Sequence, residues 1–433
     1  MNVCVVAQGK IGLPLAVQIA GKGHSVVGVD IDAKAVATIN SGEPPFPGEA
    51  NLDVRLQQVL ADGNFTADTN TAEAVSNAEV VIVVVPLIVD DQANPDFRAM
   101  DAATADIARG LKPGTLVSYE TTLPVHTTRQ RFAPALEAGS GLVEGTDFYV
   151  CHSPERVYSG RIFADLRAYP KLVGGLDAKG AELAVKFYEA ALDFDLRDDL
   201  DRPNGVWDLG SAEAAELAKL METTYRDVNI GLANQFARFS DKADIDVYAV
   251  ISACNSQPFS HVHQPGIAVG GHCIPVYPRF YMFNDAEASI PAAARATNDS
   301  MPQYSVDQLA DLMGDLNGQH VVILGAAYRG DVQETAFSGV FGVVQALEKA
   351  GAIVSVHDPL YSDDELRTFG LTPHELGTAC DGLILQANHS LYADLSPVQF
   401  PGVRGFVDGR NMTSAEPWRA ARVPRAVIGA PQQ

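Results

Sequence analysis

Residues 1–30 read MNVCVVAQGKIGLPLAVQIAGKGHSVVGVD, two short apolar runs separated by a glycine-containing turn and a helical pattern. The runs 3–6 and 25–30 are rich in valine and have the length of buried strands. Residues 14–22 between them have the spacing of a helix. Strand, turn, helix and strand in this order predict a parallel sheet with helices on both faces.

The turn AQGKIG at 7–12 matches a dinucleotide-binding fingerprint in which Ala7 replaces the first glycine. Glycines in such a turn let the backbone approach a pyrophosphate at the N-terminus of the helix. Asp30 ends the next strand. A carboxylate at this position accepts hydrogen bonds from the ribose hydroxyls and so selects NAD over NADP. A purely structural tight turn is the alternative. The residues expected at the NAD site are Gly9, Lys10, Ile11, Gly12, Asp30, Lys34, Val85, Pro86, Thr121 and Arg329.

The same alternation continues to residue 150 and returns after residue 320. Further strands are predicted at 79–85, 115–119, 147–150, 320–324, 353–357 and 382–386, and further helices at 33–40, 72–77 and 100–111. The second series repeats the first, because a turn with Gly325 and Gly330 follows its first strand and Asp358 follows the next.

Between the two series, residues 211 to about 242 predict one long helix, with Ser211 as its N-cap and Glu213 in its first turn. This helix is either a long core helix or a connection that also packs against a second subunit. The predicted fold is therefore α/β, with two Rossmann-like doubly wound domains joined by a long central helix. The predicted domains are residues 1–205, 206–300 and 301–433, and the tail after Asn411 is expected to be poorly packed.

The composition argues against several classes of protein. The net charge of −23 is opposite to the basic surface that nucleic acids require. The five cysteines form no CxxC pair, which argues against a zinc site or a disulfide framework and fits a reducing compartment. Met1 leads directly into an apolar run, and the longest such run, 80–89, is well short of the ~20 residues that span a bilayer. We expect a cytoplasmic protein without a metal, a membrane partner or a nucleic-acid partner.

Three further segments suggest chemistry. The run GGHCIP at 270–275 places the Cys273 thiol on a tight backbone, although most cysteines are buried and inert. The run SPERV at 153–157 follows a strand of the first domain. Lys219, Thr223 and Arg226 are spaced i, i+4 and i+7 on the long helix and so share one face. Such a face is usually solvated, but its neighbours here are apolar.

These segments, together with KLMETTYRDVN at 219–229 and Asn234, resemble the nucleotide-sugar 6-dehydrogenases over nearly the whole chain. Members of this family act on UDP-glucose, GDP-mannose or UDP-N-acetylhexosamines and serve polysaccharide biosynthesis. The forms PERV and GGHC are most similar to the branch that acts on UDP-N-acetylmannosamine and UDP-N-acetylglucosamine. The resemblance implies a homodimer that binds a UDP-sugar in its C-terminal domain.

The resemblance also implies a four-electron oxidation of the sugar C6 alcohol to a uronate with two NAD. Lys219 and a water near Thr122 would assist removal of the hydroxyl proton and stabilise oxyanions. Cys273 would attack the aldehyde to give a thiohemiacetal and then a thioester, which Glu155 would help to hydrolyse. The implied substrate-binding residues are Glu155, Arg156, Val157, Lys219, Thr223, Arg226, His261, His263, Gly270 and Tyr277.

Several positions depart from the family pattern. Thr223 stands where asparagine is frequent, and Tyr277 where aspartate is frequent. Ala336 occupies a place where an arginine often contacts the cofactor, which leaves Arg329 as the nearby cation. Phe259 lies near the place of an arginine that often reaches a neighbouring subunit, and His261 and His263 could replace it. These departures leave the identity of the sugar open.

Other functions therefore remain beside a UDP-N-acetylhexosamine 6-dehydrogenase. The chain could act on UDP-glucose or GDP-mannose. A two-electron dehydrogenase of a hydroxy acid or alcohol would share the first turn but would need neither Cys273 nor a second Rossmann-like domain. A catalytically silent binder of sugar nucleotides is compatible with Thr223 and Tyr277.

Overall fold

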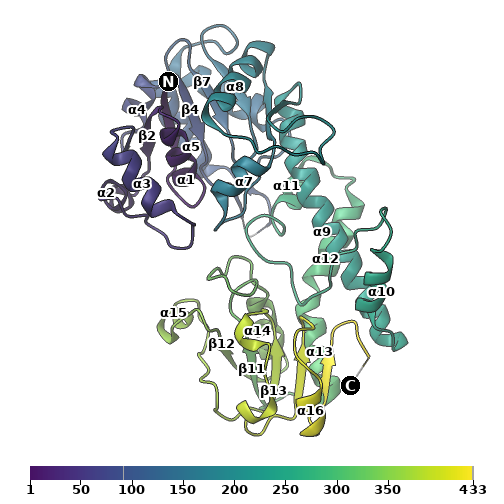
Figure 1. The fold of residues 1–433 in the computed structure, drawn as a ribbon. Helices are drawn as coiled ribbons and strands as arrows, with labels where there is room; N and C mark the ends of the chain where they lie inside the picture. Colours follow the sequence, from purple (N-terminus) through teal and green to yellow (C-terminus); the bar gives the residue numbers. More distant parts are fainter. Residues whose placement is uncertain (91, 432–433) are drawn as a thin grey trace. The chain divides into compact units, whose positions relative to one another are not determined.

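The fold was determined as a computed structural model, which describes residues 1–90 and 92–431. The chain divides into two compact units, Met1–Met221 and Glu222–Gln433, and each is described by itself. Each unit contains a sheet of mostly or entirely parallel strands between helices (Figure 1).

The first unit is built on an eight-stranded sheet with the order β10-β9-β8-β7-β4-β1-β2-β3. The six strands β8, β7, β4, β1, β2 and β3 are parallel to one another. Strands β9 and β10 are parallel to each other and run antiparallel to these six. The chain leaves β1 in one direction through β2 and β3 and in the other through β4, so a topological switch point lies between β1 and β4. The strands are β1 (Asn2–Val6), β2 (Ser25–Val29), β3 (Phe65–Asp68), β4 (Val80–Val83), β7 (Leu116–Tyr119), β8 (Tyr149–His152), β9 (Lys171–Gly175) and β10 (Val206–Asp208), with a separate hairpin of β5 (Ile88–Val89) and β6 (Pro95–Asp96).

Helices cover both faces of this sheet, as the continuous valine runs predict. Ser118 shares a hydrogen bond of 2.7 Å with Tyr188, whereas the next residue, Tyr119, shares one of 3.0 Å with Thr104 and stacks on Phe132. Adjacent residues of one strand therefore meet helices on opposite faces. The helices are α1 (Gly12–Gly21), α2 (Ala33–Asn40), α3 (Leu52–Ala61), α4 (Thr71–Asn77), α5 (Arg98–Gly110), η1 (Thr128–Phe132), α6 (Ala133–Ser140), α7 (Ile162–Ala168) and α8 (Ala178–Ala191).

One strand lies later than the sequence predicts. The prediction placed it at 147–150, and β8 begins at Tyr149. The residues before it form a turn, in which the Asp147 carboxylate accepts the amide of Val143 at 2.9 Å and the Asp147 amide bonds the Val143 carbonyl. These bonds keep residues 143–147 out of the sheet.

The long helix α9 (Ala212–Ala243) continues from the first unit into the second, as predicted. Ser211 caps it by accepting the amide of Ala214 at 3.1 Å. Within the first unit, the buried Glu216 carboxylate accepts the amides of His126 and Thr128 at 2.7 and 2.8 Å. These contacts fix the start of the helix to the loop after β7.

The second unit has a five-stranded parallel sheet with the order β12-β11-β13-β14-β15. Its strands alternate between two cores, because Val321 and Ile323 pack on one face and Val322 and Leu324 on the other. The strands are β11 (His320–Leu324), β12 (Ile353–His357), β13 (Gly382–Leu385), β14 (Gly405–Asp408) and β15 (Arg425–Val427). The helices are α10 (Val247–Cys254), α11 (Tyr277–Asn284), α12 (Ser289–Asp299), α13 (Met301–Met313), α14 (Gly339–Lys349), α15 (Asp363–Thr368), η2 (Ser390–Tyr392), η3 (Pro397–Gln399) and α16 (Glu416–Ala420). A mostly parallel sheet in the first unit, an all-parallel sheet in the second and a long central helix confirm the predicted fold class.

The prediction of a poorly packed tail after Asn411 is wrong. The tail forms α16 and the edge strand β15, and Trp418 is fully buried against Phe406 with a centroid separation of 4.3 Å. Arg425 pairs with Asp408 at 2.9 Å inside the unit. The prolines mislead here because Pro417 lies in the first turn of α16, where proline is tolerated.

In the described part of the chain, the length and apolarity that a membrane-crossing helix needs are not combined in any helix.

The packed tail generates a stability prediction. Trp418→Ala should lower the free energy of unfolding by about 3–5 kcal/mol, because it removes the largest fully buried side chain. Val398→Ala is the control, since Val398 is 89% exposed, and should change it by less than ~0.5 kcal/mol. Urea unfolding followed by circular dichroism measures both free energies. Equal effects of the two substitutions would contradict the packing of Trp418 in the core.

Candidate active site

The turn after β1 has a strained backbone. Ala7 has φ +77°, the left-handed region where glycine is favoured and where another residue costs roughly 1–2 kcal/mol. A Cβ at Gly12 would lie 1.9 Å from the Ala7 carbonyl oxygen, so only glycine fits there. The Asp30 carboxylate accepts the amide of Gln8 at 2.7 Å and holds the turn against the end of β2.

The residues of this turn fit a dinucleotide. A Cβ at Gly9 would meet no atom within 4 Å, so the protein's own packing does not require glycine there. Helix α1 starts without a side-chain cap and without an acidic residue in its first turn, which leaves its N-terminal dipole open to an anion. Asp30 and Ile11 are half-buried, and Lys10 and Lys34 are exposed.

Other expected cofactor residues lie at the carboxyl ends of neighbouring strands. The Thr121 hydroxyl donates to the Val85 carbonyl at 2.7 Å and joins the loops after β7 and β4. Pro86 is exposed beside them, and Thr122 is buried. These loops flank the switch point between β1 and β4, where doubly wound sheets bind ligands.

The SPERV segment continues along the same edge of the sheet. Its Ser153 amide bonds the Tyr119 carbonyl at 2.9 Å, and the Glu155 amide bonds the Glu120 carbonyl at 3.2 Å. The Glu155 carboxylate accepts the Arg156 amide at 2.6 Å and the Lys171 ammonium at 2.9 Å. Arg156 and Val157 are half-buried beside it.

Lys171 and Glu120 were missed by the sequence analysis. Lys171 also contacts the Glu120 carboxylate at 2.6 Å, and both side chains are buried. Burial raises the pKa of Glu120 to about 7 despite the ammonium. Burial also acts to raise the pKa of Glu155. The charge and the hydrogen bond of Lys171 outweigh this effect, so the pKa of Glu155 is lowered. A lysine opening the apolar run KLVGG was the available sequence signal.

In the second unit, the glycines before Cys273 hold a tight loop. Gly271 has φ +88°, and its amide donates to the Ala336 carbonyl at 2.8 Å. A Cβ at Gly270 would lie 2.5 Å from the Tyr328 Cβ. Cys273 is half-buried, and its carbonyl accepts the amides of residues 276 and 277 at the start of α11. Helix α11 has no acidic residue in its first turn.

Two arginines follow strands of the second sheet at the same edge, and one of them lies beside this loop. Arg329 donates to the Tyr328 hydroxyl at 3.0 Å, so this expected cofactor residue lies in the second unit beside the thiol loop. Arg410, which sequence analysis did not consider, donates to the Gln386 carbonyl at 2.5 Å and lies against Gly266. No strand was predicted at 405–408, so nothing in the sequence marked Arg410.

The remaining substrate candidates belong to α9 and to the loop after α10. On α9, Lys219 lies in the first unit, and Thr223 and Arg226 lie in the second. Asn229 holds the loop by donating to the His261 carbonyl at 2.7 Å and accepting the His263 amide at 2.9 Å. Tyr277 begins α11.

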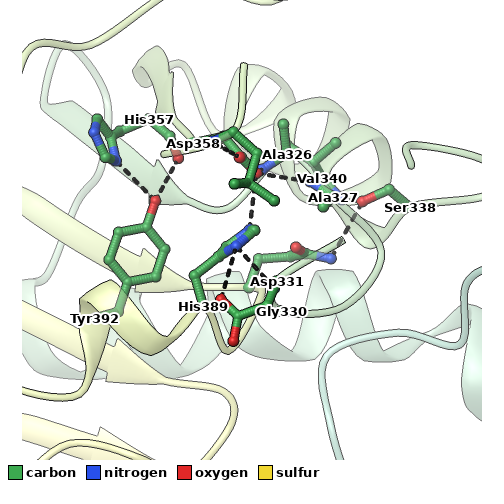
Figure 2. A network of polar contacts seen from close by, with 12 residues as sticks. Ala326, Ala327, Gly330, Asp331, Ser338, Val340, His357, Asp358, His389 and Tyr392 are labelled. Atoms are coloured by element: carbon green, nitrogen blue, oxygen red, sulfur yellow. Dashed lines mark hydrogen bonds and ion pairs between the residues drawn. The ribbon is translucent and has the colours of Figure 1, made fainter. Parts of the chain in front are cut away.

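The second unit repeats the aspartate-locked turn of the first. The buried Asp358 carboxylate accepts the amides of Ala326 and Ala327 at 2.7 and 3.0 Å and contacts His389 Nε2 at 3.0 Å (Figure 2). Because His389 Nδ1 accepts the Asp331 amide, its Nε2 carries the proton and donates to Asp358. Unlike the half-buried Asp30, Asp358 is fully enclosed by these bonds.

The whole chain is similar to one group of enzymes. Residues 1–192 match the NAD binding domain of the UDP-glucose/GDP-mannose dehydrogenase family, 213–300 its central domain and 322–415 its UDP binding domain. A UDP-N-acetyl-D-mannosamine dehydrogenase of Pyrococcus horikoshii is 33% identical, over 96% of this chain and 97% of that protein. An NDP-N-acetyl-D-galactosaminuronic acid dehydrogenase of Ralstonia nicotianae is 31% identical, over 96% and 97%. The solved structure of a UDP-D-ManNAc dehydrogenase from P. horikoshii has a TM-score of 0.87 at 30% identity, over 99% of each chain. These matches confirm the predicted resemblance and the NAD cofactor.

The two glycines of the first turn generate a paired prediction. Gly12→Ala should lower the melting temperature, because its Cβ meets the Ala7 carbonyl, whereas Gly9→Ala should leave it unchanged. Gly9→Ala should instead weaken NAD binding by about tenfold or more, because its Cβ enters the space needed for close approach of the pyrophosphate. Differential scanning fluorimetry and calorimetric titration with NAD measure the two effects. Wild-type affinity in Gly9→Ala would contradict this placement of the cofactor.

Proposed function

Because the chain belongs to the UDP-glucose/GDP-mannose dehydrogenase family, we propose that it is an NAD-dependent UDP-N-acetylhexosamine 6-dehydrogenase that works through a thioester on Cys273. The observation that carries this proposal is the half-buried thiol on a glycine-constrained loop at the start of α11. A two-electron dehydrogenase has no use for such a thiol. It is therefore disfavoured.

The first oxidation needs a group that manages the proton of the C6 hydroxyl. Lys219 serves this role with a water held near Thr122, and its positive charge stabilises the developing oxyanion. NAD held at the turn with Gly9 and Asp30 would supply the hydride acceptor for both oxidations at C6. The product of the first is an aldehyde.

The Cys273 thiolate then adds to the aldehyde carbon, and the carbonyl oxygen takes a proton to give a thiohemiacetal. Loss of the hydroxyl proton and of the second hydride leaves a thioester. Glu155 takes a proton from water as the water oxygen bonds the acyl carbon, and the carbon–sulfur bond breaks to release the uronate. The low pKa of Glu155 supports this role, because a base must be ionised before it can accept a proton.

We assign the UDP-sugar to the second unit, with the predicted contributions of Thr223, Arg226, His261, His263, Gly270 and Tyr277. The match of residues 322–415 to a UDP binding domain supports this assignment. Arg329 and Arg410 are the cations proposed to offset the diphosphate charge. An N-acetylmannosamine sugar is favoured because the P. horikoshii relative bears that name and aligns over nearly the whole chain.

We further propose a homodimer, formed by the predicted central domain at residues 206–300. In the second unit, α9 exposes Tyr225, Leu232, Phe236 and Phe239, whose side chains are 44–64% exposed. Their spacing of seven, four and three residues places them on one face of the helix. A contiguous apolar face of this kind is typical of a protein interface. The need for a reduced Cys273 supports the predicted cytoplasmic location.

The dimer proposal predicts that charge on this face separates the subunits. Phe236→Asp combined with Phe239→Asp should give a monomer of 46.1 kDa in light scattering, because two carboxylates cannot be buried unpaired in an apolar interface. Val398→Asp, at an exposed position in η3, should stay dimeric. A monomeric wild-type protein at micromolar concentration would contradict the proposal.

The thioester proposal predicts different outcomes for the two accessible cysteines. Cys273→Ala should lower uronate formation by on the order of 10⁴-fold or more, the scale for loss of a covalent nucleophile. Cys273→Ser should accumulate a uronyl ester, because an ester is hydrolysed more slowly than a thioester. Cys254→Ser, at an exposed cysteine, should behave as wild type.

Intact-protein mass spectrometry after mixing with UDP-N-acetylmannosamine and NAD detects the ester. A Cys273→Ser enzyme that turns over normally without any adduct would contradict covalent catalysis.

A further inference from the structure

Lys171 is a buried cation inside the first unit. Its side chain is only 5% exposed, at the start of β9. A lysine is rarely buried, because removing an ammonium from water costs several kcal/mol unless carboxylates compensate. Its Nζ lies 2.6 Å from Glu120 Oε2 and 2.9 Å from Glu155 Oε2. One ammonium therefore contacts two carboxylates, Glu120 in the loop after β7 and Glu155 in the loop after β8.

The contacts continue beyond Glu120 into the core. The Tyr188 hydroxyl donates to Glu120 Oε1 at 2.6 Å and shares a hydrogen bond of 2.7 Å with Ser118. Both Ser118 and Tyr188 are fully buried, so this chain of polar groups ends inside the protein. It offers no exit for a proton taken up by Glu155, and its effect must be on position and charge.

The cluster is asymmetric. Two carboxylates and one ammonium leave one net negative charge when both acids are ionised. Burial raises the pKa of Glu120 to about 7, whereas Lys171 and the Arg156 amide bring the pKa of Glu155 below its usual range against the effect of burial. The negative charge therefore concentrates on Glu155. Glu155 Oε1 accepts the Arg156 amide and Oε2 accepts the Lys171 ammonium, and a carboxylate oxygen can accept more than one donor.

We infer that Lys171 is a positioning residue for catalysis, which holds the Glu155 carboxylate oriented to take a proton from the water that hydrolyses the Cys273 thioester. This inference rests on the proposed function. In the step, the water proton moves to Glu155, its oxygen bonds the acyl carbon, and the sulfur leaves with the bonding electron pair. Glu120 secures Lys171 from the other side, and neither residue touches the substrate.

The inference has a definite sign for pH. The titratable or charged groups around Glu155, on the strands, helices and loops packed against it, are Lys171, Glu120, His152, Arg156, Asp165, Tyr169 and Tyr188. Lys171 lowers the pKa of Glu155, so removal of the ammonium raises that pKa. A base with a raised pKa is protonated at higher pH, so the acid limb of hydrolysis moves upward.

The test uses Lys171→Met, Lys171→Arg and a control, Lys179→Met, which removes an exposed lysine of α8 that pairs with Glu182 at 2.9 Å. Steady-state uronate formation is measured from about pH 5.5 to 9. Lys171→Met should shift the acid limb upward by about one unit or more, which is about tenfold at a fixed pH on the limb. It should also accumulate the thioester on Cys273 at low pH, visible by intact-protein mass. Lys171→Arg should restore much of the wild-type profile, and Lys179→Met should not change it.

Lys171→Met leaves two buried acids without a cation, so it could lose its fold. Glu120→Gln combined with Lys171→Met removes both charges of the buried pair and supplies the second test. If Lys171 is only structural, the double variant regains the wild-type acid limb. If it positions Glu155, the limb stays shifted and the thioester still accumulates.

The outcomes separate this inference from the proposed function. A folded Lys171→Met or double variant with a wild-type acid limb and no adduct overturns the role of Lys171, while wild-type production of uronate still supports the function. A wild-type enzyme that forms no uronate from any UDP-sugar overturns both.

Discussion

A carboxylate that accepts the amides of a glycine turn is the constraint on which both units depend. Asp30 holds the turn after β1, and Asp358 holds the turn after β11. Asp30 follows β2 and Asp358 follows β12, the strands that pair with β1 and β11. The hydrogen bonds of each aspartate therefore join the turn, the neighbouring strand and the start of the next helix. In the first unit this constraint keeps Ala7 left-handed and brings Gly12 against its carbonyl, which sets the start of α1. In the second unit Asp358 is buried and also contacts His389 (Figure 2).

Much of the fold could be predicted because its local signals agree with its tertiary environment. Valine runs became the central strands of a sheet covered on both faces, and Ser211 capped the long helix as expected. Prediction failed where contacts distant in sequence decide the outcome. The antiparallel β9 and β10 have no signal distinguishing them from parallel strands. The tail orders because Trp418 enters a core formed by residues far before it.

The candidate site divides in the same way. Local sequence was enough to single out three parts of the site. Glycines mark the first turn, glycines and a proline mark Cys273, and the SPERV run marks Glu155. Lys171 and Glu120 could not, because a charged residue next to an apolar run normally faces solvent, and only the folded sheet brings both to Glu155. Arg410 was missed for the same reason, since its place beside Gly266 depends on the second sheet.

The central claim is a four-electron oxidation in which one enzyme takes the sugar from alcohol to acid. Its most direct measurement is the amount of NADH formed per UDP-N-acetylmannosamine consumed, with the product identified by mass spectrometry. The account requires two NADH for each uronate, and no free aldehyde, because the thiol retains the carbon between oxidations. One NADH per sugar with an aldehyde as the final product would contradict it.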